Sequence, residues 1–171
     1  GWYSDSGLTK KVGDGGSSYT PTSSLTLYAK WTDTTKPTIS LSPNTQATYV
    51  SGGKAVTVTL ADSGSGLKAS QPIYYVWSTS NTTVPTSWSS VTSTNTAGAK
   101  SATVTVPATS NSSLTGTYYL WIKAGTLSDV SGNTSNQVVS ALFKFDNKNP
   151  TVSVSTSKTT KSITAVATAS A

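Results

Sequence analysis

Apolar and polar side chains alternate with a period of two along most of this 171-residue chain, and this pattern constrains the fold more than any other feature. In the run at 56–60, valine or leucine occupies every second position and threonine lies between them; similar alternation is present at 102–106 and 139–145. Successive side chains of a β-strand point to opposite faces of a sheet, so each run predicts a strand with one buried face. Threonine suits the solvent face because its branched Cβ favours an extended backbone.

Clusters of Gly, Ser, Asp and Asn separate these runs at short intervals, including 51–53, 62–66, 96–98 and 129–133. These residue types favour turns, and no window shows apolar residues at the 3.6-residue period of a helix. Short strands joined by frequent turns are typical of two packed antiparallel sheets. The sequence therefore predicts an all-β chain built around a β-sandwich.

An internal repeat indicates where the modules begin. The segment DTTKPTISLS at 33–42 is followed, 113 residues further on, by the similar segment DNKNPTVSVS at 146–155. This spacing predicts a complete module at 33–146, preceded by a separate segment at 1–32 and followed at 147–171 by the first two strands of a second module. The proline in each copy, Pro37 and Pro150, restricts φ and lacks an amide donor, so we expect it to stiffen the joint.

The composition excludes most catalytic chemistry. The chain contains no His, Cys, Met, Arg or Glu, whereas Ser and Thr fill 63 positions. Without His there is no ordinary general base near neutral pH, and without Cys there is no thiol nucleophile or thiolate metal site. We expect a protein that is not an enzyme and has no cofactor, with Ca²⁺ the one ion that its Asp residues leave open.

Charge and hydropathy restrict the partners. Twelve Lys and six Asp give a net charge of +6, but the lysines are scattered and the bidentate contacts that Arg makes to phosphate and guanine are absent, so we expect no nucleic-acid partner. The longest apolar runs, such as 73–77 and 118–122, are far shorter than the ~20 residues that cross a bilayer, so we expect no membrane insertion. A chain that begins at Gly1 without a signal segment is expected to be part of a longer protein.

Residues 1–32 contain GWY at 1–3, LTKKV at 8–12 and LTLYAKW at 25–31. This pattern resembles the second half of the internalin-type B repeat of surface proteins. The resemblance implies a β-grasp-like module of which the first strand and the Gly-rich stretch before GWY are missing. Leu25, Leu27, Ala29 and Trp31 share one strand face with Trp2 as their obvious partner, so we expect these side chains to be exposed, disordered or covered by a neighbour.

Residues 33–146 resemble the bacterial Ig-like domains that occur in tandem on cell-surface proteins. The segments that carry this resemblance are DTTKPTI at 33–39, DSGSGL at 62–67, GTYYLWIKA at 116–124 and SDVSGN at 128–133. The resemblance implies an Ig-like antiparallel β-sandwich, flanked by a partial β-grasp-like repeat and by the first strands of a second Ig-like module. It also implies an extracellular location, on the bacterial cell surface or secreted.

The resemblance also assigns a direction to each side chain of the strand at 118–124. Ig-like domains usually have a Gx(Y)xLxVxA strand here, and the match implies that Tyr118, Leu120, Ile122 and Ala124 point inward and the residues between them outward. The neighbouring strand at 73–77 supplies Trp77 as the expected core tryptophan.

An aromatic surface is one candidate binding site. Tyr74, Tyr119 and Trp121 are expected on the outward face of adjacent strands, where their rings would stack on the apolar side of a sugar, with Ser and Thr hydroxyls close by. The favoured alternative is that these rings pack against an adjacent module or cover the edge of the sandwich.

A cation site is the second candidate. The loops that contain Asp62 and Asp129 are expected at the same end of the sandwich, with Asn133 and backbone carbonyls nearby. Ca²⁺ takes about six to eight oxygen ligands, and two aspartates supply few of them. The favoured alternative is a pair of Asx-turns, in which each carboxylate accepts hydrogen bonds from its own loop.

These observations favour a non-catalytic spacer of a bacterial cell-surface or secreted protein, which projects a distal, adhesion-related domain and has the adjacent modules of its own chain as partners. Two alternatives remain. One is a module that binds a glycan or a host surface protein through the aromatic surface, and the other is an accessory domain of a secreted glycoside hydrolase or a phage fibre.

Overall fold

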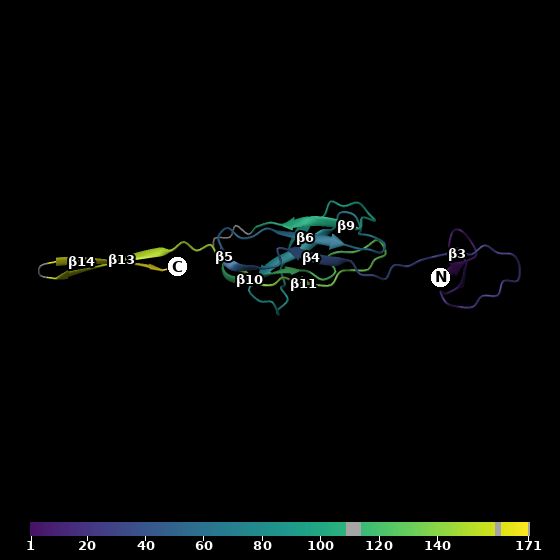
Figure 1. Ribbon diagram of the computed structural model, residues 1–171, viewed down its shortest axis with the longest axis horizontal. Helices are drawn as coiled ribbons and strands as arrows, with labels where there is room; N and C mark the ends of the chain where they lie inside the picture. The colour runs from purple at the N-terminus through teal and green to yellow at the C-terminus, as the bar shows by residue number, and fades with distance from the viewer. Residues whose placement is uncertain (109–113, 160–161, 171) are drawn as a thin grey trace. The chain divides into compact units, whose positions relative to one another are not determined.

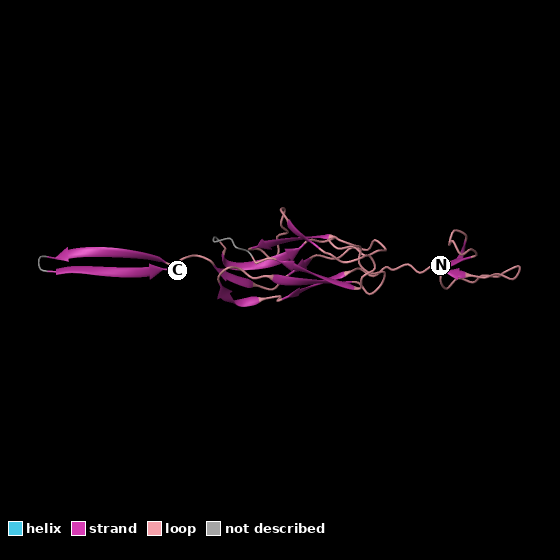
Figure 2. Ribbon diagram, turned by 90° about the horizontal axis from the view of Figure 1, so that it is seen from above, coloured by secondary structure: helices cyan, strands magenta, loops and turns pink. Residues whose placement is uncertain are grey.

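A computed structural model of the chain describes residues 1–108, 114–159 and 162–170, and these residues form strands and loops without any helix (Figure 2). No helix capable of crossing a membrane is therefore present in this part of the chain. The strands are β1 Trp2–Tyr3, β2 Lys11–Gly13, β3 Tyr28–Ala29, β4 Thr38–Ser42, β5 Gln46–Val50, β6 Val56–Ala61, β7 Pro72–Ser78, β8 Ser89–Thr92, β9 Ser101–Val106, β10 Thr115–Ile122, β11 Val138–Val139, β12 Phe143–Asp146, β13 Thr151–Thr159 and β14 Ser162–Ser170. The expected all-β fold is confirmed.

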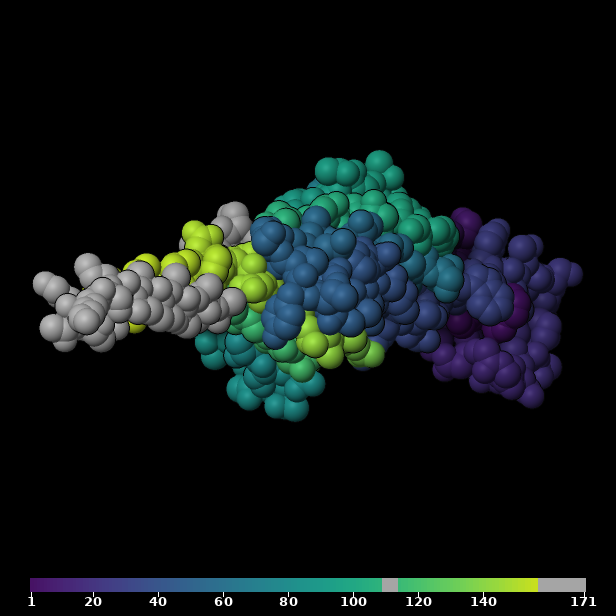
Figure 3. All heavy atoms as spheres, turned by 60° about the vertical axis from the view of Figure 1, so that its left-hand side comes forward, coloured from purple at the N-terminus to yellow at the C-terminus, as the bar shows by residue number. Residues whose placement is uncertain are grey.

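The chain divides into two compact units, Gly1–Thr35 and Lys36–Ala171. The larger unit contains a β-sandwich formed by β4 to β12 (Figure 1). One sheet has the order β4-β6-β9, and the other has the order β5-β12-β10-β7-β8 with β11 also paired to β10. In the space-filling view, segments that are far apart in the sequence, coloured blue, teal and green, pack side by side in this body (Figure 3).

One strand pair departs from the antiparallel arrangement that we expected. β5 pairs with β12 in parallel, with Phe143 opposite Gln46 and Phe145 opposite Val50. The chain passes from the β4 sheet to the β5 sheet around Pro43 without reversing its direction, so β5 runs the same way as β12. Pro43 has no amide hydrogen to donate, which suits a position where a strand leaves its ladder.

The predicted alternation creates the core. In β6, Val56, Val58 and Leu60 are fully buried, and they pair with the inward residues of β9, among them Val104 and Val106. Strand β10 supplies the core of the other sheet through Leu120 and Ile122, as predicted, and both are fully buried. The buried hydrophobic cluster comprises Val56, Val58, Leu60, Leu67, Ile73, Val104, Val106, Leu120, Ile122, Leu127, Phe143 and Phe145.

Trp77 occupies the position expected of a core tryptophan. Its ring packs edge-on against Phe143, with centroids 5.0 Å apart, and against Phe145, with centroids 5.3 Å apart. These contacts join β7 to β12 across the width of β10, because β10 pairs with both strands. Edge-to-face aromatic pairs of this kind add about 0.5 to 1.5 kcal/mol each beyond the area that they bury.

Two details of the predicted strands are wrong. The run at 139–145 does not form one continuous strand, because Ser140 turns inward while Ala141 is exposed. The Ser140 hydroxyl accepts a hydrogen bond from the amide of Leu120 at 2.8 Å and donates one to the carbonyl of Ala141 at 2.7 Å, which separates β11 from β12. Ala124, expected inward, is exposed because β10 ends at Ile122 and a turn follows.

The smaller unit is a three-stranded sheet of order β2-β1-β3. Trp2 pairs with Gly13 on one side and with Ala29 on the other. A hollow of about 370 Å³ is lined by residues that include Trp2, Tyr19, Leu25 and Leu27. Several large apolar side chains of this unit are exposed, and Trp31 is the most exposed at 88%. The side chains for which we expected exposure, disorder or a covering neighbour are therefore exposed.

Asp5 organises the turn between β1 and β2. Its carboxylate accepts hydrogen bonds from the amides of Thr9 and Lys10 and from the Thr9 hydroxyl, at 2.6 to 3.1 Å. These bonds, led by the one from the Lys10 amide, hold the pKa of Asp5 below its ordinary value of 3.8.

β13 and β14 form a two-stranded antiparallel hairpin, with Thr151 opposite Ser170 and Thr159 opposite Ser162. Val152 and Val154 of β13 are 65% and 64% exposed. The hairpin thus presents two apolar side chains to solvent, and the expectation that these residues begin a second module stays a prediction.

Replacement of a core valine tests whether the interior between the sheets stabilises the sandwich. Val58→Ala removes two buried methyl groups and leaves a cavity, so we expect the free energy of unfolding to fall by about 2 kcal/mol in chemical denaturation. Val84→Ala is the matched control, since Val84 is 56% exposed and its loss is expected to cost less than about 0.5 kcal/mol. Equal effects of the two changes would contradict the assigned core.

The Asp5 network predicts that the smaller unit loses stability in acid. Because the folded pKa of Asp5 lies below 3.8, its stabilising contribution is present above that value and is lost as the pH falls through the folded pKa. Carbon-detected NMR titration should therefore give an Asp5 pKa below 3.8. In Asp5→Asn the acid dependence of this unit should become shallower, while the share from Asp14, whose pKa is lowered by the Lys11 ammonium, persists. An Asp5 pKa at or above the ordinary value would contradict the network.

Candidate functional site

The two loops predicted to share one end of the sandwich do so. The loop at 62–66 follows β6, and the loop at 129–133 lies beyond the end of β10. They are joined by backbone hydrogen bonds, from the amide of Val130 to the carbonyl of Gly66 at 2.8 Å and from the amide of Lys68 to the carbonyl of Ser128 at 3.0 Å. Asp62 and Asp129 are thereby brought together from positions 67 residues apart in the sequence.

Asp62 is 3% exposed, and its two carboxylate oxygens differ in their surroundings. Oδ2 accepts a hydrogen bond from the amide of Gly66 at 2.6 Å, which closes the loop. Oδ1 is buried and has no hydrogen-bond partner among the described residues. A buried acceptor without a partner is uncommon in folded proteins, because its desolvation is not compensated.

Asp129 is fully buried and uses both oxygens within its own loop. Oδ1 accepts from the backbone amide of Asn133 at 2.7 Å, and Oδ2 accepts from the Asn133 side-chain amide at 2.6 Å. The Asx-type reading is therefore confirmed for Asp129, and for one oxygen of Asp62. Asn133 directs N–H donors at the carboxylate, so this contact orients Asp129 and does not itself offer an oxygen ligand.

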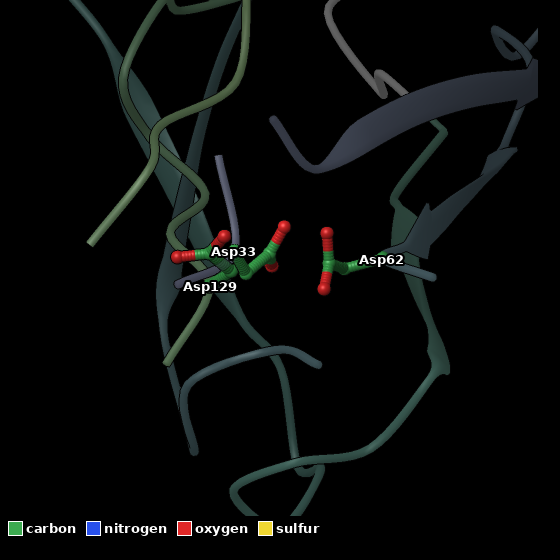
Figure 4. A group of neighbouring side chains, drawn as sticks. All are labelled: Asp33, Asp62 and Asp129. Atoms are coloured by element: carbon green, nitrogen blue, oxygen red, sulfur yellow. The ribbon is translucent and has the colours of Figure 1, made fainter. Parts of the chain in front are cut away.

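The carboxylates of Asp62 and Asp129, drawn in Figure 4, lie close together: one oxygen of each is within 4.8 Å of one oxygen of the other. Asp62 and Asp129 both belong to the sandwich, and the candidate site is built on this pair. Two negative charges within that distance repel each other by at least about 3.5 kcal/mol at an effective dielectric constant of about 20.

Lys100 is the cation whose contacts lie in the 62–66 loop. Its ammonium donates to the carbonyls of Ser63, at 3.4 Å, and Gly64. No ion pair connects a lysine to Asp62 or Asp129 among the described residues. The Lys100 ammonium is thus hydrogen-bonded to backbone carbonyls of the loop. Among the described residues, neither carboxylate has a direct counterion.

The predicted aromatic surface is on the outer face of the second sheet, but it is not an open platform. Tyr119 and Trp121 alternate along β10 with Leu120 and Ile122, which belong to the buried cluster, so both aromatic residues lie on the face away from the core. Tyr74 is 38% exposed and Tyr119 is half-buried. The Lys123 ammonium lies 5.4 Å from the centre of the Tyr74 ring and 6.0 Å from that of Trp88.

The expectation that Trp121 is available to a ligand is wrong. Its side chain is only 1% exposed, although it points away from the core. Its indole Nε1 donates a hydrogen bond of 2.8 Å to the carbonyl of Ser80, in the connection between β7 and β8. This tryptophan therefore anchors the connection against the sheet and cannot stack on a sugar in this conformation.

Comparison with known proteins gives no further assignment, since no family model, curated protein or solved structure matches the chain.

The close approach at Gly66 provides a test of the candidate site's framework. Gly66 has φ of +82°, and a Cβ added there would lie 2.3 Å from the carbonyl oxygen of Gly98. We expect Gly66→Ala to lower the free energy of unfolding by about 3 kcal/mol or more, because backbone strain and a backbone clash act together.

Gly125→Ala is the matched control. Gly125 has φ of +71° but no atom within 4 Å of an added Cβ, so only the backbone strain, about 1 kcal/mol, is expected. Both variants are compared by urea denaturation followed by tryptophan fluorescence. A cost for Gly66→Ala no larger than that for Gly125→Ala would refute the predicted clash.

Proposed function

We propose that this chain is a non-catalytic spacer segment of a bacterial cell-surface or secreted protein, in which Ig-like modules hold a distal domain away from the envelope. The observation that carries the proposal is that the chain enters the sandwich at one end and leaves it at the other. A module with this geometry can be joined to further copies end to end, and each copy adds to the reach of the protein.

The strand register defines both ends. Thr38, the first residue of β4, lies opposite Ala61, the last residue of β6, and therefore next to the 62–66 loop. Asp146, the last residue of β12, lies opposite Thr115, the first residue of β10. Because the 129–133 loop joins the 62–66 loop beyond the other end of β10, the two ends of the module are separated by at least the length of that strand, about 24 Å for eight residues.

The repeated segment supports the same proposal. Pro37 and Pro150 occupy equivalent positions in the two copies, each immediately before a strand, β4 or β13. The first residues of the repeated segment thus precede both the sandwich and the hairpin. The expected partners are the neighbouring modules of the same chain, and the surface, rich in Ser and Thr and low in charge, is suited to solubility.

A spacer must keep its length under tension, and the register predicts that it does. Force applied at the two ends pulls β4 and β12 along their own axes, so the ladder hydrogen bonds, which lie across an antiparallel pair, are loaded together in shear. In single-molecule pulling we expect one cooperative unfolding event that releases about 350 Å of contour length for the roughly 110 residues of the sandwich.

Different attachment points provide the control. The chain has no cysteine, so handles can be introduced by Lys54→Cys and Pro107→Cys. Val56 pairs with Val106, which places these handles at the same end of β6 and β9, where force would separate the ladder one bond at a time. We expect a lower unfolding force for this pair than for handles at the chain ends. Extension from the ends without a force peak would count against the spacer function.

A further inference from the structure

We propose that the pair Asp62 and Asp129 binds one hard divalent cation of the Ca²⁺ type at the end of the sandwich where the chain enters. This inference goes beyond the spacer role and does not depend on it.

The first support is the unpartnered oxygen of Asp62. The side chain is 3% exposed, and Oδ1 has no hydrogen-bond partner among the described residues, whereas Oδ2 accepts from Gly66. Figure 4 shows this carboxylate facing that of Asp129. The loop thus uses one oxygen for its own closure and leaves the other buried and unpartnered, in a carboxylate that lies close to that of Asp129, where a cation would satisfy it.

The second support is the uncompensated charge. Asp62 and Asp129 are both buried, with an oxygen of each within 4.8 Å of the other. Buried charges persist when they are paired or coordinate a metal, and neither carboxylate has a lysine partner in the described part of the chain. One divalent cation between them would neutralise both charges.

The ligand chemistry selects the class of ion. The chain contains no His, Cys or Met, so the nitrogen and sulfur ligands that Zn²⁺ and Cu prefer are absent. Carboxylate oxygens suit Ca²⁺, which accepts irregular geometry and completes its six to eight ligands with carbonyls and water. A site with few protein carboxylates is expected to bind in the range of extracellular modules, with Kd about 0.1 to 1 mM.

Isothermal titration of the whole chain with CaCl₂, after treatment with a chelator and in about 0.1 M KCl to screen weak surface attraction, tests the proposal. We expect one saturable site, and a Kd at least about tenfold higher in Asp62→Asn, which replaces a charged ligand by a neutral one of the same shape. Asp14→Asn makes the same change at an exposed residue of the smaller unit, paired with Lys11, and should leave the Kd unchanged.

Thermal unfolding supplies a second measurement that remains informative if Asp62→Asn folds poorly. The midpoint temperature of unfolding of the unmodified chain should rise with Ca²⁺ concentration, because an ion that binds only the folded state stabilises that state. No saturable binding by the unmodified chain up to about 10 mM Ca²⁺, ten times the weakest expected Kd, would overturn the proposal. An unchanged Kd in a folded Asp62→Asn protein would do the same.

Discussion

The burial of alternate side chains between two sheets is the interaction on which the rest of this structure depends. Val56, Val58 and Leu60 form one side of the interior, and Leu120 and Ile122 contribute to the other. A shift of one residue in either sheet would move these side chains to the solvent face, so the core also determines the register of the strands. The register in turn decides which loops meet at each end of the sandwich.

The strand register explains how a chain with only six acidic residues brings two carboxylates together. Asp62 follows the last residue of β6, and Asp129 lies in a loop that bridges back to Leu67. The hydrogen bonds of Gly66 and Asn133 position the two side chains, and burial prevents water from screening their charges. The proposed cation site therefore lies at the end of the module that the chain enters through β4, one of the two ends on which the proposed spacer function depends.

The aromatic residues show what the sequence pattern of one strand can predict and what it cannot. The sequence predicted Leu120 and Ile122 inward and Trp121 outward, and the buried cluster, which contains the first two and not Trp121, confirms all three directions. Whether an outward residue is accessible depends on what lies above the sheet, and this is a property of the connection at residues 79–88. The bond from Trp121 to Ser80 spans 41 residues, and no local pattern indicates it.

The sequence by itself determined the all-β class and the inward residues of β6, β9 and most of β10, because strand periodicity and turn composition are local properties. Only the tertiary structure decided the parallel pairing of β5 with β12, the inward turn of Ser140, the burial of Trp121 and the unpartnered oxygen of Asp62. Each of these depends on hydrogen bonds or burial between segments distant in the sequence, and a period of two contains no information about such contacts.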